Sequence, residues 1–181
     1  MENPIRVVVL TISDRCSAGE AVDTAGPAVA RLLQSTIGAR VVHREILPDE
    51  QPRIAGKLIH YCDIEPVDMI VTVGGTGPAP RDVTPEATRD VIDRTMPGFG
   101  EAMRLASLQK TPTAMLSRGI SGIRKATFII NLPGSERGAV ENLAAILPAI
   151  PHGVRLVRGH AADCDCCAPL KKAPAVALSC G

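Results

Sequence analysis

The feature that most constrains this chain is a regular alternation between short apolar runs, rich in β-branched residues, and longer segments with helical spacing. Uninterrupted apolar runs are typical of strands that are buried on both faces of a sheet. Residues 5–13 and 68–73 have this character, and residues 40–47 and 126–133 are predicted as two further strands. Because helical segments separate them, the sequence predicts a three-layer α/β/α fold with a mostly parallel central sheet.

The segments between the apolar runs carry helix signals. Helical spacing or capping residues mark residues 26–34, 51–63, 84–94, 98–109 and 136–150. Pro27 is expected at the first helical position of its segment, where its missing N–H costs nothing. Thr84 and Ser135 are expected to cap the helices that follow them. The polar stretch 14–23 is expected to be a loop.

Length and composition exclude several classes of function. The 181 residues, of which 45% are hydrophobic, suit one domain with a proper core, followed by a tail. The chain has 20 basic and 19 acidic residues, no Trp, one Tyr and two Phe, which argues against a nucleic-acid partner. No apolar run approaches the roughly 20 residues of a membrane span. The N-terminal run lacks the flanks of a signal peptide, so we expect a soluble, cytoplasmic protein.

Four loops follow the four predicted strands, and all carry turn formers, hydroxyls or carboxylates. They are Ser13–Glu20, Pro48–Glu50, Gly74–Asp82 and Pro133–Ser135. In an open parallel sheet, ligands bind beyond the carboxyl ends of the strands. We therefore expect the loops to meet at one rim, although the strand order that this requires does not follow from the pattern.

The third of these loops begins with Gly-Gly-Thr-Gly at residues 74–77. Glycine adopts positive φ at little cost, and successive N–H groups in such a turn form an anion-binding concavity. The hydroxyl of Thr76 adds a donor. The loop lacks the Gly-Lys-Ser/Thr of a Walker loop and the spacing of a dinucleotide fingerprint. An ordinary turn and a phosphate-binding loop explain the glycines equally well.

Carboxylates accompany the glycines at this predicted rim. Asp49 follows the second predicted strand and Asp82 ends the glycine loop. Mg²⁺ in proteins prefers one or two carboxylates together with substrate phosphates. Asp14 is a third candidate for the pocket, and Arg81 offers a charge-assisted contact to an anion. The alternatives are helix caps or solvated charges for the aspartates and a surface ion pair for Arg81.

Six motifs, in order along the chain, resemble the MogA/MoaB family of molybdenum-cofactor biosynthesis. They are TISDRCSAGEAVDTAGP, LPDE, VGGTGPAPRDVTPEAT, MPGFGEAMR, TAMLSRGISGIR and IINLPGS. The likeness covers residue 5 to about residue 159, and it extends to the matching domain of gephyrin and of its plant counterpart. The PRDVTPEAT motif is similar to the MogA and gephyrin branch, and the MoaB branch often departs from it.

The resemblance implies adenylylation of molybdopterin, in which the terminal phosphate of the pterin attacks the α-phosphorus of ATP and pyrophosphate leaves. It implies Mg²⁺ as cofactor, with Asp49 and Asp82 as the functional carboxylates that hold Mg²⁺ and position the nucleotide. It also implies a homo-oligomer, namely a trimer, and transfer of the product to a molybdate-insertion protein of the MoeA kind. A phosphate nucleophile at neutral pH needs no general base.

The resemblance also implies further site residues. Phosphate would be cradled by Gly74, Gly75, Thr76 and Gly77. The pterin or its phosphate would be contacted by Ser13, Asp14, Ser17, Ser117 and Arg118. The nucleotide side would be shaped by Pro133, Gly134 and Ser135. The N-terminus of the helix after Ser135 would add donors on that side.

Two other classes of function stay open. One is a non-catalytic pterin-binding or scaffold protein of the MoaB type, and retention of Asp49 and Asp82 argues against it. The other is a different nucleotide enzyme on the same fold, as in CinA-type proteins. The MLSR and NLPGS motifs beside RDVTPEAT argue against that second alternative.

The last residues depart from the family, so we predict a domain at 1–159 and a flexible tail at 160–181. The tail holds His160, Cys164, Cys166, Cys167 and Cys180. Thiolates and imidazoles bind Zn²⁺, but the usual C-x₂-C spacing is missing and the Ala and Pro content suits a flexible end. Metal binding by the tail is the less favoured alternative. The two remaining cysteines, Cys16 and Cys62, are isolated and expected to be reduced.

Overall fold

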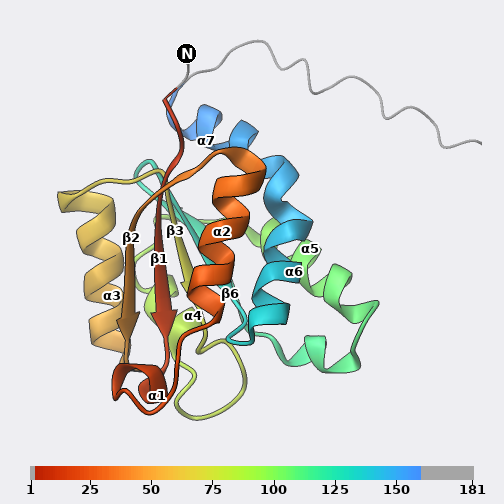
Figure 1. Cartoon of the computed structure of the whole chain (residues 1–181). Helices are drawn as coiled ribbons and strands as arrows, with labels where there is room; N and C mark the ends of the chain where they lie inside the picture. The colour runs from red at the N-terminus through yellow and green to blue at the C-terminus, as the bar shows by residue number, and fades with distance from the viewer. Residues whose placement is uncertain (1–2, 160–181) are drawn as a thin grey trace, which may run out of the picture.

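The computed structural model describes residues 3–159 and confirms the three-layer α/β/α fold (Figure 1). Its sheet has six strands in the order β2-β1-β3-β6-β5-β4. The strands are β1 (Arg6–Ile12), β2 (Arg40–Leu47), β3 (Met69–Val73), β4 (Arg94–Thr95), β5 (Ser121–Arg124) and β6 (Thr127–Leu132). The first three and β6 are parallel, whereas β5 and β4 add to one edge in antiparallel orientation. The predicted tail and its cysteines lie outside the described residues.

Helices cover both faces of the sheet (Figure 1). They are α1 (Asp14–Ser17), α2 (Ala25–Ile37), α3 (Gln51–Ile59), α4 (Thr84–Arg89), α5 (Pro97–Leu108), α6 (Glu136–Ile146) and α7 (Ile150–Val157). Three shorter elements are the π-helix η1 (His60–Ile64) and the 3-10 helices η2 (Pro112–Leu116) and η3 (Leu147–Ala149). Helices α2, α5, α6 and α7 pack on one face, and α3, η1 and α4 pack on the other.

The core consists of alternate residues of the central strands, sorted to the two faces. Val7 and Val9 pack in the cluster under α2 and α6, whereas Val8 and Leu10 pack in the cluster under α3 and α4. Burial of one such side chain contributes roughly 1.5–3 kcal/mol. Because β1, β3 and β6 are covered on both faces, every residue in them except Arg6 is buried, and most of those residues are apolar.

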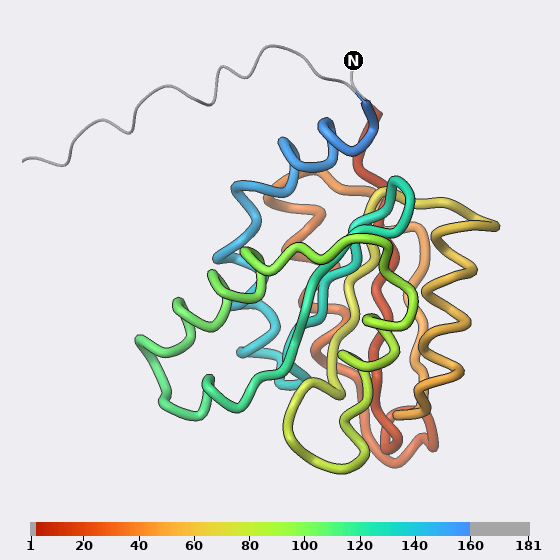
Figure 2. Tube along the Cα trace, turned by 180° about the vertical axis from the view of Figure 1, so that it is seen from behind, coloured from red at the N-terminus to blue at the C-terminus, as the bar shows by residue number. Residues whose placement is uncertain are grey.

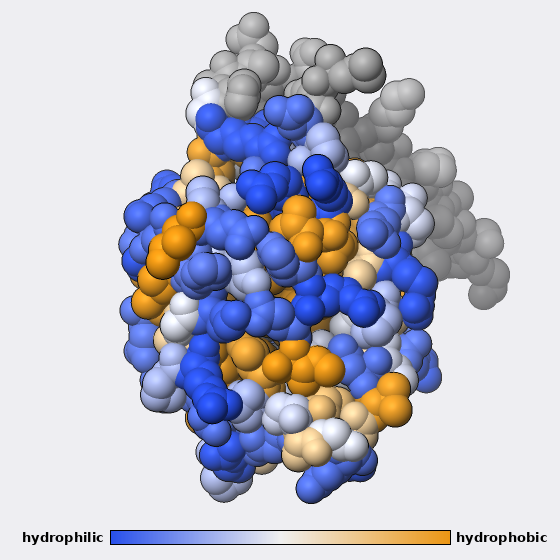
Figure 3. All heavy atoms as spheres, turned by 60° about the vertical axis from the view of Figure 1, so that its left-hand side comes forward, coloured by the Kyte–Doolittle hydropathy of each residue, from blue (hydrophilic) through white to orange (hydrophobic). Residues whose placement is uncertain are grey.

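The edge strand β2 is only partly covered. Figure 3 shows the side of the molecule that bears α3, and this side is largely hydrophilic with a few separate hydrophobic patches. Exposed large apolar residues on or next to β2 and α3 are Ile46, Ile59 and Ile64. Within residues 3–159, no helix is long and apolar enough to cross a bilayer.

The structure corrects the starts of two predicted helices. Helix α2 begins at Ala25, so Pro27 is its third residue rather than its first. The missing N–H of proline remains harmless there, because the first four N–H groups of a helix have no intrahelical acceptor. Helix α4 includes Thr84 as its first residue and is preceded by Val83 as N-cap. The hydroxyl of Thr84 is buried and makes no cap hydrogen bond, so the expectation that it caps α4 was wrong.

Three other boundaries differ from expectation. The predicted loop 14–23 contains the single turn α1, because the Ser13 hydroxyl accepts a hydrogen bond from the Cys16 N–H and caps that turn. Helix α4 ends early, since the following residues join the antiparallel edge, where the Asp93 N–H donates to the Ile123 carbonyl. The predicted helix 136–150 is divided into α6, η3 and α7 around Pro148. The Ser135 cap is confirmed, with its hydroxyl accepting from the Gly138 N–H.

The carboxyl ends of the four parallel strands lie at the same end of the sheet, as predicted. The Ser13 N–H after β1 donates to the carbonyl of Leu47 at the end of β2, and the Gly74 N–H after β3 donates to Leu132 at the end of β6. Figure 2 shows α1 and the loop after β3 together at this carboxyl end. The start of β1 and the end of α7 lie at the opposite, amino end.

Candidate active site at the carboxyl end of the sheet

The glycines of the loop after β3 are required by its conformation. Gly74 and Gly75 have φ of +114° and +61°, in the region that glycine favours. A Cβ on Gly74 would overlap the carbonyl oxygen of Ile12. A Cβ on Gly75 would overlap the hydroxyl of Thr84 and lie 2.9 Å from Asp49 Oδ1. The loop therefore packs directly against the end of β1, the start of α4 and the Asp49 carboxylate.

Asp14 and Asp49 are joined by a reciprocal pair of hydrogen bonds. The Asp14 N–H donates to Asp49 Oδ2 at 2.9 Å, and the Asp49 N–H donates to Asp14 Oδ1 at 3.0 Å. Arg81, from the glycine loop, donates from Nε and Nη2 to the two oxygens of Asp14, at 2.9 Å and 2.8 Å. The loops after β1, β2 and β3 are therefore held together by charged side chains and main-chain N–H groups.

The two aspartates of this pair differ in their electrostatics. Hydrogen bonds from Arg81 lower the pKa of Asp14, helped by its bond from the Asp49 main chain. Burial raises the pKa of Asp49, and the negative charges of Asp14 and Asp82 raise it further. Asp49 and Asp82 are thus two neighbouring carboxylates that repel each other, an arrangement that a bound cation would relieve.

The donor set fits Mg²⁺ only with a ligand's help. Within residues 3–159, no three His, Cys, Asp or Glu side chains are grouped so that they could hold a metal by themselves. One or two carboxylates completed by substrate phosphates are what Mg²⁺ uses in phosphoryl-transfer sites. Asp49 and Asp82 match that requirement, and the unpartnered, buried hydroxyl of Thr84 lies against Gly75 together with Asp49.

Two pockets open at this end of the sheet. The narrower one, which we call the acidic pocket, has a volume of about 250 Å³. Its lining includes Ser13, Asp23, Asp49 and Gly74. The wide pocket has a volume of about 410 Å³. Its lining includes Thr76, Gly77, Arg104, Lys110, Ser117, Pro133 and Ser135.

Both pockets are lined by Gly75, Asp82 and Gly134, which we call the shared strip. The strip is possible because Gly134 has no side chain, since a Cβ there would lie 3.3 Å from the Cα of Gly74. Asp82 is oriented within the loop by the Ala79 N–H, which donates to its Oδ2 at 2.9 Å. One carboxylate thus faces a region that molecules in either pocket can reach.

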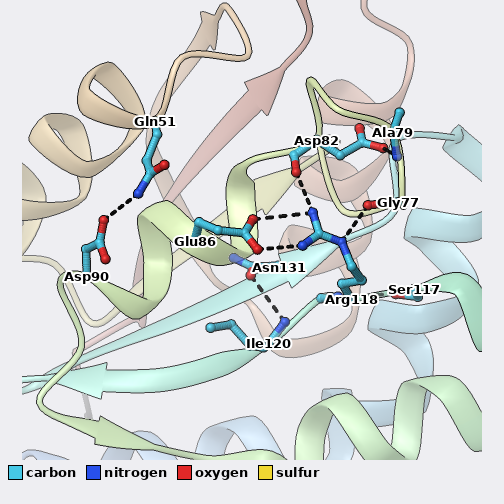
Figure 4. A network of polar contacts seen from close by, with 11 residues as sticks. Gln51, Gly77, Ala79, Asp82, Glu86, Asp90, Ser117, Arg118, Ile120 and Asn131 are labelled. Carbon is cyan, nitrogen blue, oxygen red and sulfur yellow. Dashed lines mark hydrogen bonds and ion pairs between the residues drawn. The ribbon is translucent and has the colours of Figure 1, made fainter.

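The structure brings most of the predicted site residues together. Those that line one or both pockets are Ser13, Asp49, Gly74, Gly75, Thr76, Gly77, Asp82, Ser117, Pro133, Gly134 and Ser135. Asp14, Ser17 and Arg118 lie outside these linings. The Ser17 hydroxyl donates to the Asp14 carbonyl within α1, and the Arg118 guanidinium is directed at the glycine loop (Figure 4).

Sequence reasoning missed four charged residues of the pockets, which are Arg104, Lys110, Glu141 and Asp23. Arg104 lies within the MPGFGEAMR motif, and its Nη1 donates to the Gly119 carbonyl at 2.9 Å. Lys110 pairs with Glu141 at 3.0 Å on the wall of the wide pocket. Asp23 accepts hydrogen bonds from the Thr11 hydroxyl and the Gly26 N–H. The family motifs were a usable signal for Arg104 and Asp23, whereas Lys110 and Glu141 lie outside the motifs and reach the pocket through helix packing.

Comparison with known proteins gives a consistent result. The sequence model of a family described as "Probable molybdopterin binding domain" matches residues 8–152. The chain is 46% identical over 157 residues to a molybdopterin adenylyltransferase of Helicobacter pylori strain J99, covering 86% of this chain and 89% of that protein. It is 41% identical over 175 residues to the molybdopterin adenylyltransferase of Escherichia coli K12, covering 96% and 89% respectively.

The fold agrees with a solved structure of the same group. The molybdopterin biosynthesis enzyme MoaB from Thermus thermophilus superposes with a TM-score of 0.81 at 49% identity. The match covers 86% of this chain and 97% of that one. The chain therefore belongs to the family of molybdopterin-binding domains that includes the MogA and MoaB proteins.

Proposed function

We propose that this protein is a molybdopterin adenylyltransferase, which transfers AMP from Mg-ATP to the terminal phosphate of molybdopterin. The observation that carries the proposal is the pair of pockets that meet at the shared strip. A reaction between two phosphorylated molecules needs one binding space for each and a common point where their phosphates meet. The names and identities of the curated relatives support the same activity.

In the proposed reaction, an oxygen of the pterin phosphate forms a bond to the α-phosphorus of ATP. The bond from that phosphorus to the oxygen that bridges to the β-phosphorus breaks, and pyrophosphate leaves with the electron pair. Two polyanions must approach each other in line, so catalysis consists mainly of positioning and charge stabilisation. The loops of Gly74–Gly77 and of Pro133–Ser135 supply N–H donors and open backbone for that purpose.

Mg²⁺ is the cofactor that we propose for this site, held by Asp49 and Asp82 with phosphate oxygens of the nucleotide. When bound, it neutralises phosphate charge and stabilises the leaving pyrophosphate. The reciprocal bonds between Asp14 and Asp49 fix the orientation of the Asp49 carboxylate before any ligand arrives. Asp82 presents its carboxylate at the shared strip, where both ligands are within reach.

The remaining site assignments stay predictions of the family resemblance. Ser13, Asp14, Ser17 and Ser117 are proposed to contact the pterin or its phosphate, and Pro133, Gly134 and Ser135 to shape the nucleotide side. Ser117 lines the wide pocket, and so do Pro133, Gly134 and Ser135. We therefore propose that the pterin and the nucleotide both reach the wide pocket. The resemblance also implies contact of Arg118 with the pterin phosphate, whereas its guanidinium donates to Gly77, Asp82 and Glu86 in the folded chain.

We also propose a homotrimer that works in the cytoplasm and passes its product to a molybdate-insertion protein of the MoeA kind. Large apolar side chains exposed on and beside α5 and η2 are the kind of surface that subunit contacts cover. They are Leu105, Leu108, Met115 and Leu116. Light scattering after size-exclusion chromatography measures the oligomeric state directly.

The test of the activity is incubation with molybdopterin and Mg-ATP, with pyrophosphate as the readout. We expect pyrophosphate only when both substrates and Mg²⁺ are present, and none after chelation with EDTA. The second candidate is a non-catalytic pterin-binding protein, because the matching family is described by binding alone, as a probable molybdopterin binding domain. Pterin binding by fluorescence titration without any pyrophosphate would favour that second candidate.

A further inference from the structure

We propose that Arg118 is a positioning residue, which clamps the two ends of the loop 77–82 and thereby fixes the Asp82 carboxylate at the shared strip. The inference rests on the proposed function, because it assigns a role within the adenylyl transfer at that site. It differs from the expected contact with the pterin phosphate. It follows from where the guanidinium of Arg118 is directed in the folded chain.

The guanidinium of Arg118 makes four hydrogen bonds to three residues (Figure 4). Its Nε donates to the Gly77 carbonyl at 2.8 Å, and its Nη2 donates to the Asp82 carbonyl. Nη1 and Nη2 donate to the two carboxylate oxygens of Glu86, at 2.5 Å and 3.3 Å. The main-chain N–H of Arg118 donates to the Thr76 carbonyl at 2.8 Å. One side chain therefore spans the start and the end of the loop.

Gly77 and Asp82, whose carbonyls accept from Arg118, also contact each other through the Asp82 carboxylate. A Cβ on Gly77 would lie 2.8 Å from Asp82 Oδ2, so the Asp82 carboxylate folds back against Gly77. That carboxylate also accepts from the Ala79 N–H within the loop. The position of Asp82 is thus defined relative to Gly77, and Arg118 is the residue that fixes both carbonyls at once. A misplacement of about 1 Å in such a group can cost about a hundredfold in rate.

The segment that carries Arg118 is hydrogen-bonded to the interior of the sheet. Two residues after Arg118, the Ile120 N–H donates to Asn131 Oδ1 at 3.2 Å (Figure 4). The amide nitrogen of buried Asn131 donates to the hydroxyls of Thr72 in β3 and Thr88 in α4, both at 2.9 Å. Glu86, the ionic partner of Arg118, is also on α4. Arg118 therefore lies between α4, which carries its ionic partner Glu86, and β6, which carries Asn131.

A second arginine provides the matched comparison. Arg124 donates from Nε and Nη2 to Asp63, and from Nη1 to the Val91 carbonyl. Like Arg118, Arg124 donates two hydrogen bonds to one carboxylate and a further one to a main-chain carbonyl, but it lies at the amino end of the sheet. Neither Arg124 nor its partners line the acidic or the wide pocket. Loss of its fork should affect stability without affecting chemistry.

The experiment compares wild type with Arg118→Lys and Arg124→Lys, since lysine keeps the charge but loses the planar fork. We expect Arg118→Lys to lower kcat by about tenfold or more, to raise the Mg²⁺ concentration for half-maximal rate, and to change the KM for pterin by less than about twofold. We expect Arg124→Lys to leave all three values at the wild-type level. Equal kinetic effects of the two variants would overturn the proposal, and so would a pterin KM that rises without loss of kcat.

A readout without catalysis keeps the clamp testable on its own. Hydrogen–deuterium exchange of the peptide that spans residues 76–84 should become faster in Arg118→Lys and in Glu86→Gln, and should be unchanged in Arg124→Lys. Unchanged exchange in Arg118→Lys would show that the loop does not depend on the fork. If wild type releases no pyrophosphate, the proposed function fails, while this measurement still decides whether the clamp exists.

A double variant separates positioning from direct contact with substrate. If Arg118 acts through Asp82, adding Arg118→Lys to Asp82→Asn should reduce kcat by less than about twofold beyond Asp82→Asn alone. Two independent losses would multiply instead. A multiplied loss would mean that Arg118 touches the substrate itself, and the positioning role would be wrong.

Discussion

The two ends of the sheet use the same residue types in different ways. At the amino end, Asp63 accepts two hydrogen bonds from the guanidinium of Arg124, and Asp68 accepts two from that of Arg158. Asp68 also accepts from the Arg6 N–H at the start of β1. At the carboxyl end, Asp14 has such an arginine, but within residues 3–159 neither Asp49 nor Asp82 is ion-paired with an arginine or lysine.

The pKa shifts express this difference. Hydrogen bonds from Arg124 and Lys125 lower the pKa of Asp63 to about 2. Burial and the neighbouring negative charges raise the pKa of Asp49. A carboxylate that is fully paired serves the fold, whereas one that is crowded by like charges and lacks a cation is suited to bind one. The comparison teaches that partners, rather than residue type, separate the paired aspartates of the amino end from the two that we propose to hold Mg²⁺.

The strongest test of the comparison is Asp82→Asn. The amide keeps the size of the side chain but removes its charge, so we expect turnover to fall about a hundredfold to a thousandfold, as for other electrostatic catalytic groups. Asp49→Asn should behave alike if both carboxylates hold Mg²⁺. The melting temperature should stay close to wild type in both.

Isothermal titration beside the turnover assay gives the control for that prediction. Pterin affinity should be retained in Asp82→Asn, because the pterin phosphate gains nothing from a nearby carboxylate. Normal turnover, or lost pterin affinity with retained nucleotide affinity, would show that the role given to Asp82 is wrong.

The second prediction concerns Gly75→Val in the glycine loop. Valine is strained at a φ of +61°, and its Cβ would overlap the Thr84 hydroxyl and crowd Asp49. The strain, of order 1–3 kcal/mol, should lower stability. Phosphate-ligand affinity should fall as well, because the side chain crowds the N–H donors of the loop. Titration with pyrophosphate or ATP measures it. Gly56→Ala in α3 is the control, since its Cβ would meet no atom within 4 Å, and an equal loss there would contradict the prediction.

The third prediction concerns the amino end, where Asp63→Asn should lower the melting temperature and leave turnover per folded molecule unchanged. The variant breaks the fork from Arg124 and the ion pair with Lys125, which tie η1 to the β5–β6 hairpin. Calorimetry and the pyrophosphate assay on the same sample test both parts. A loss of turnover at a temperature where the variant is fully folded would mean that the two ends of the sheet are not independent.

The smallest expected effect is a pH dependence of the same contact. The pKa of Asp63 is about 2 in the folded chain, below its ordinary value of 3.8. Its ionised form is therefore favoured by folding, so its contribution is fully present above about pH 4 and is lost as pH falls towards 2. Unfolding of wild type and Asp63→Asn should differ most above pH 4 and converge near pH 2. A difference that persists at pH 2 would point to a non-ionic role.

Much of the fold could be predicted from sequence because its signals are local. The short segments rich in β-branched residues predicted the four parallel strands, the Ser135 hydroxyl predicted the start of α6, and the glycines at 74 and 75 marked a turn of positive φ. These signals depend on periodicity and on the conformational range of single residues. The short strands β4 and β5 were missed, since Arg94–Thr95 and Ser121–Arg124 are too short for a periodic pattern.

The residues alone determined that carboxylates and glycines follow the strands of a parallel sheet, and hence where a ligand would bind. Only the tertiary structure decided which aspartates are paired with an arginine, because Asp63 and Arg124 are 61 residues apart and Asp14 and Arg81 are 67 apart. It likewise directed Arg118 to Gly77, 41 residues away. Such pairings depend on strand order and helix packing, which are global properties of the chain, and therefore no local pattern contains them.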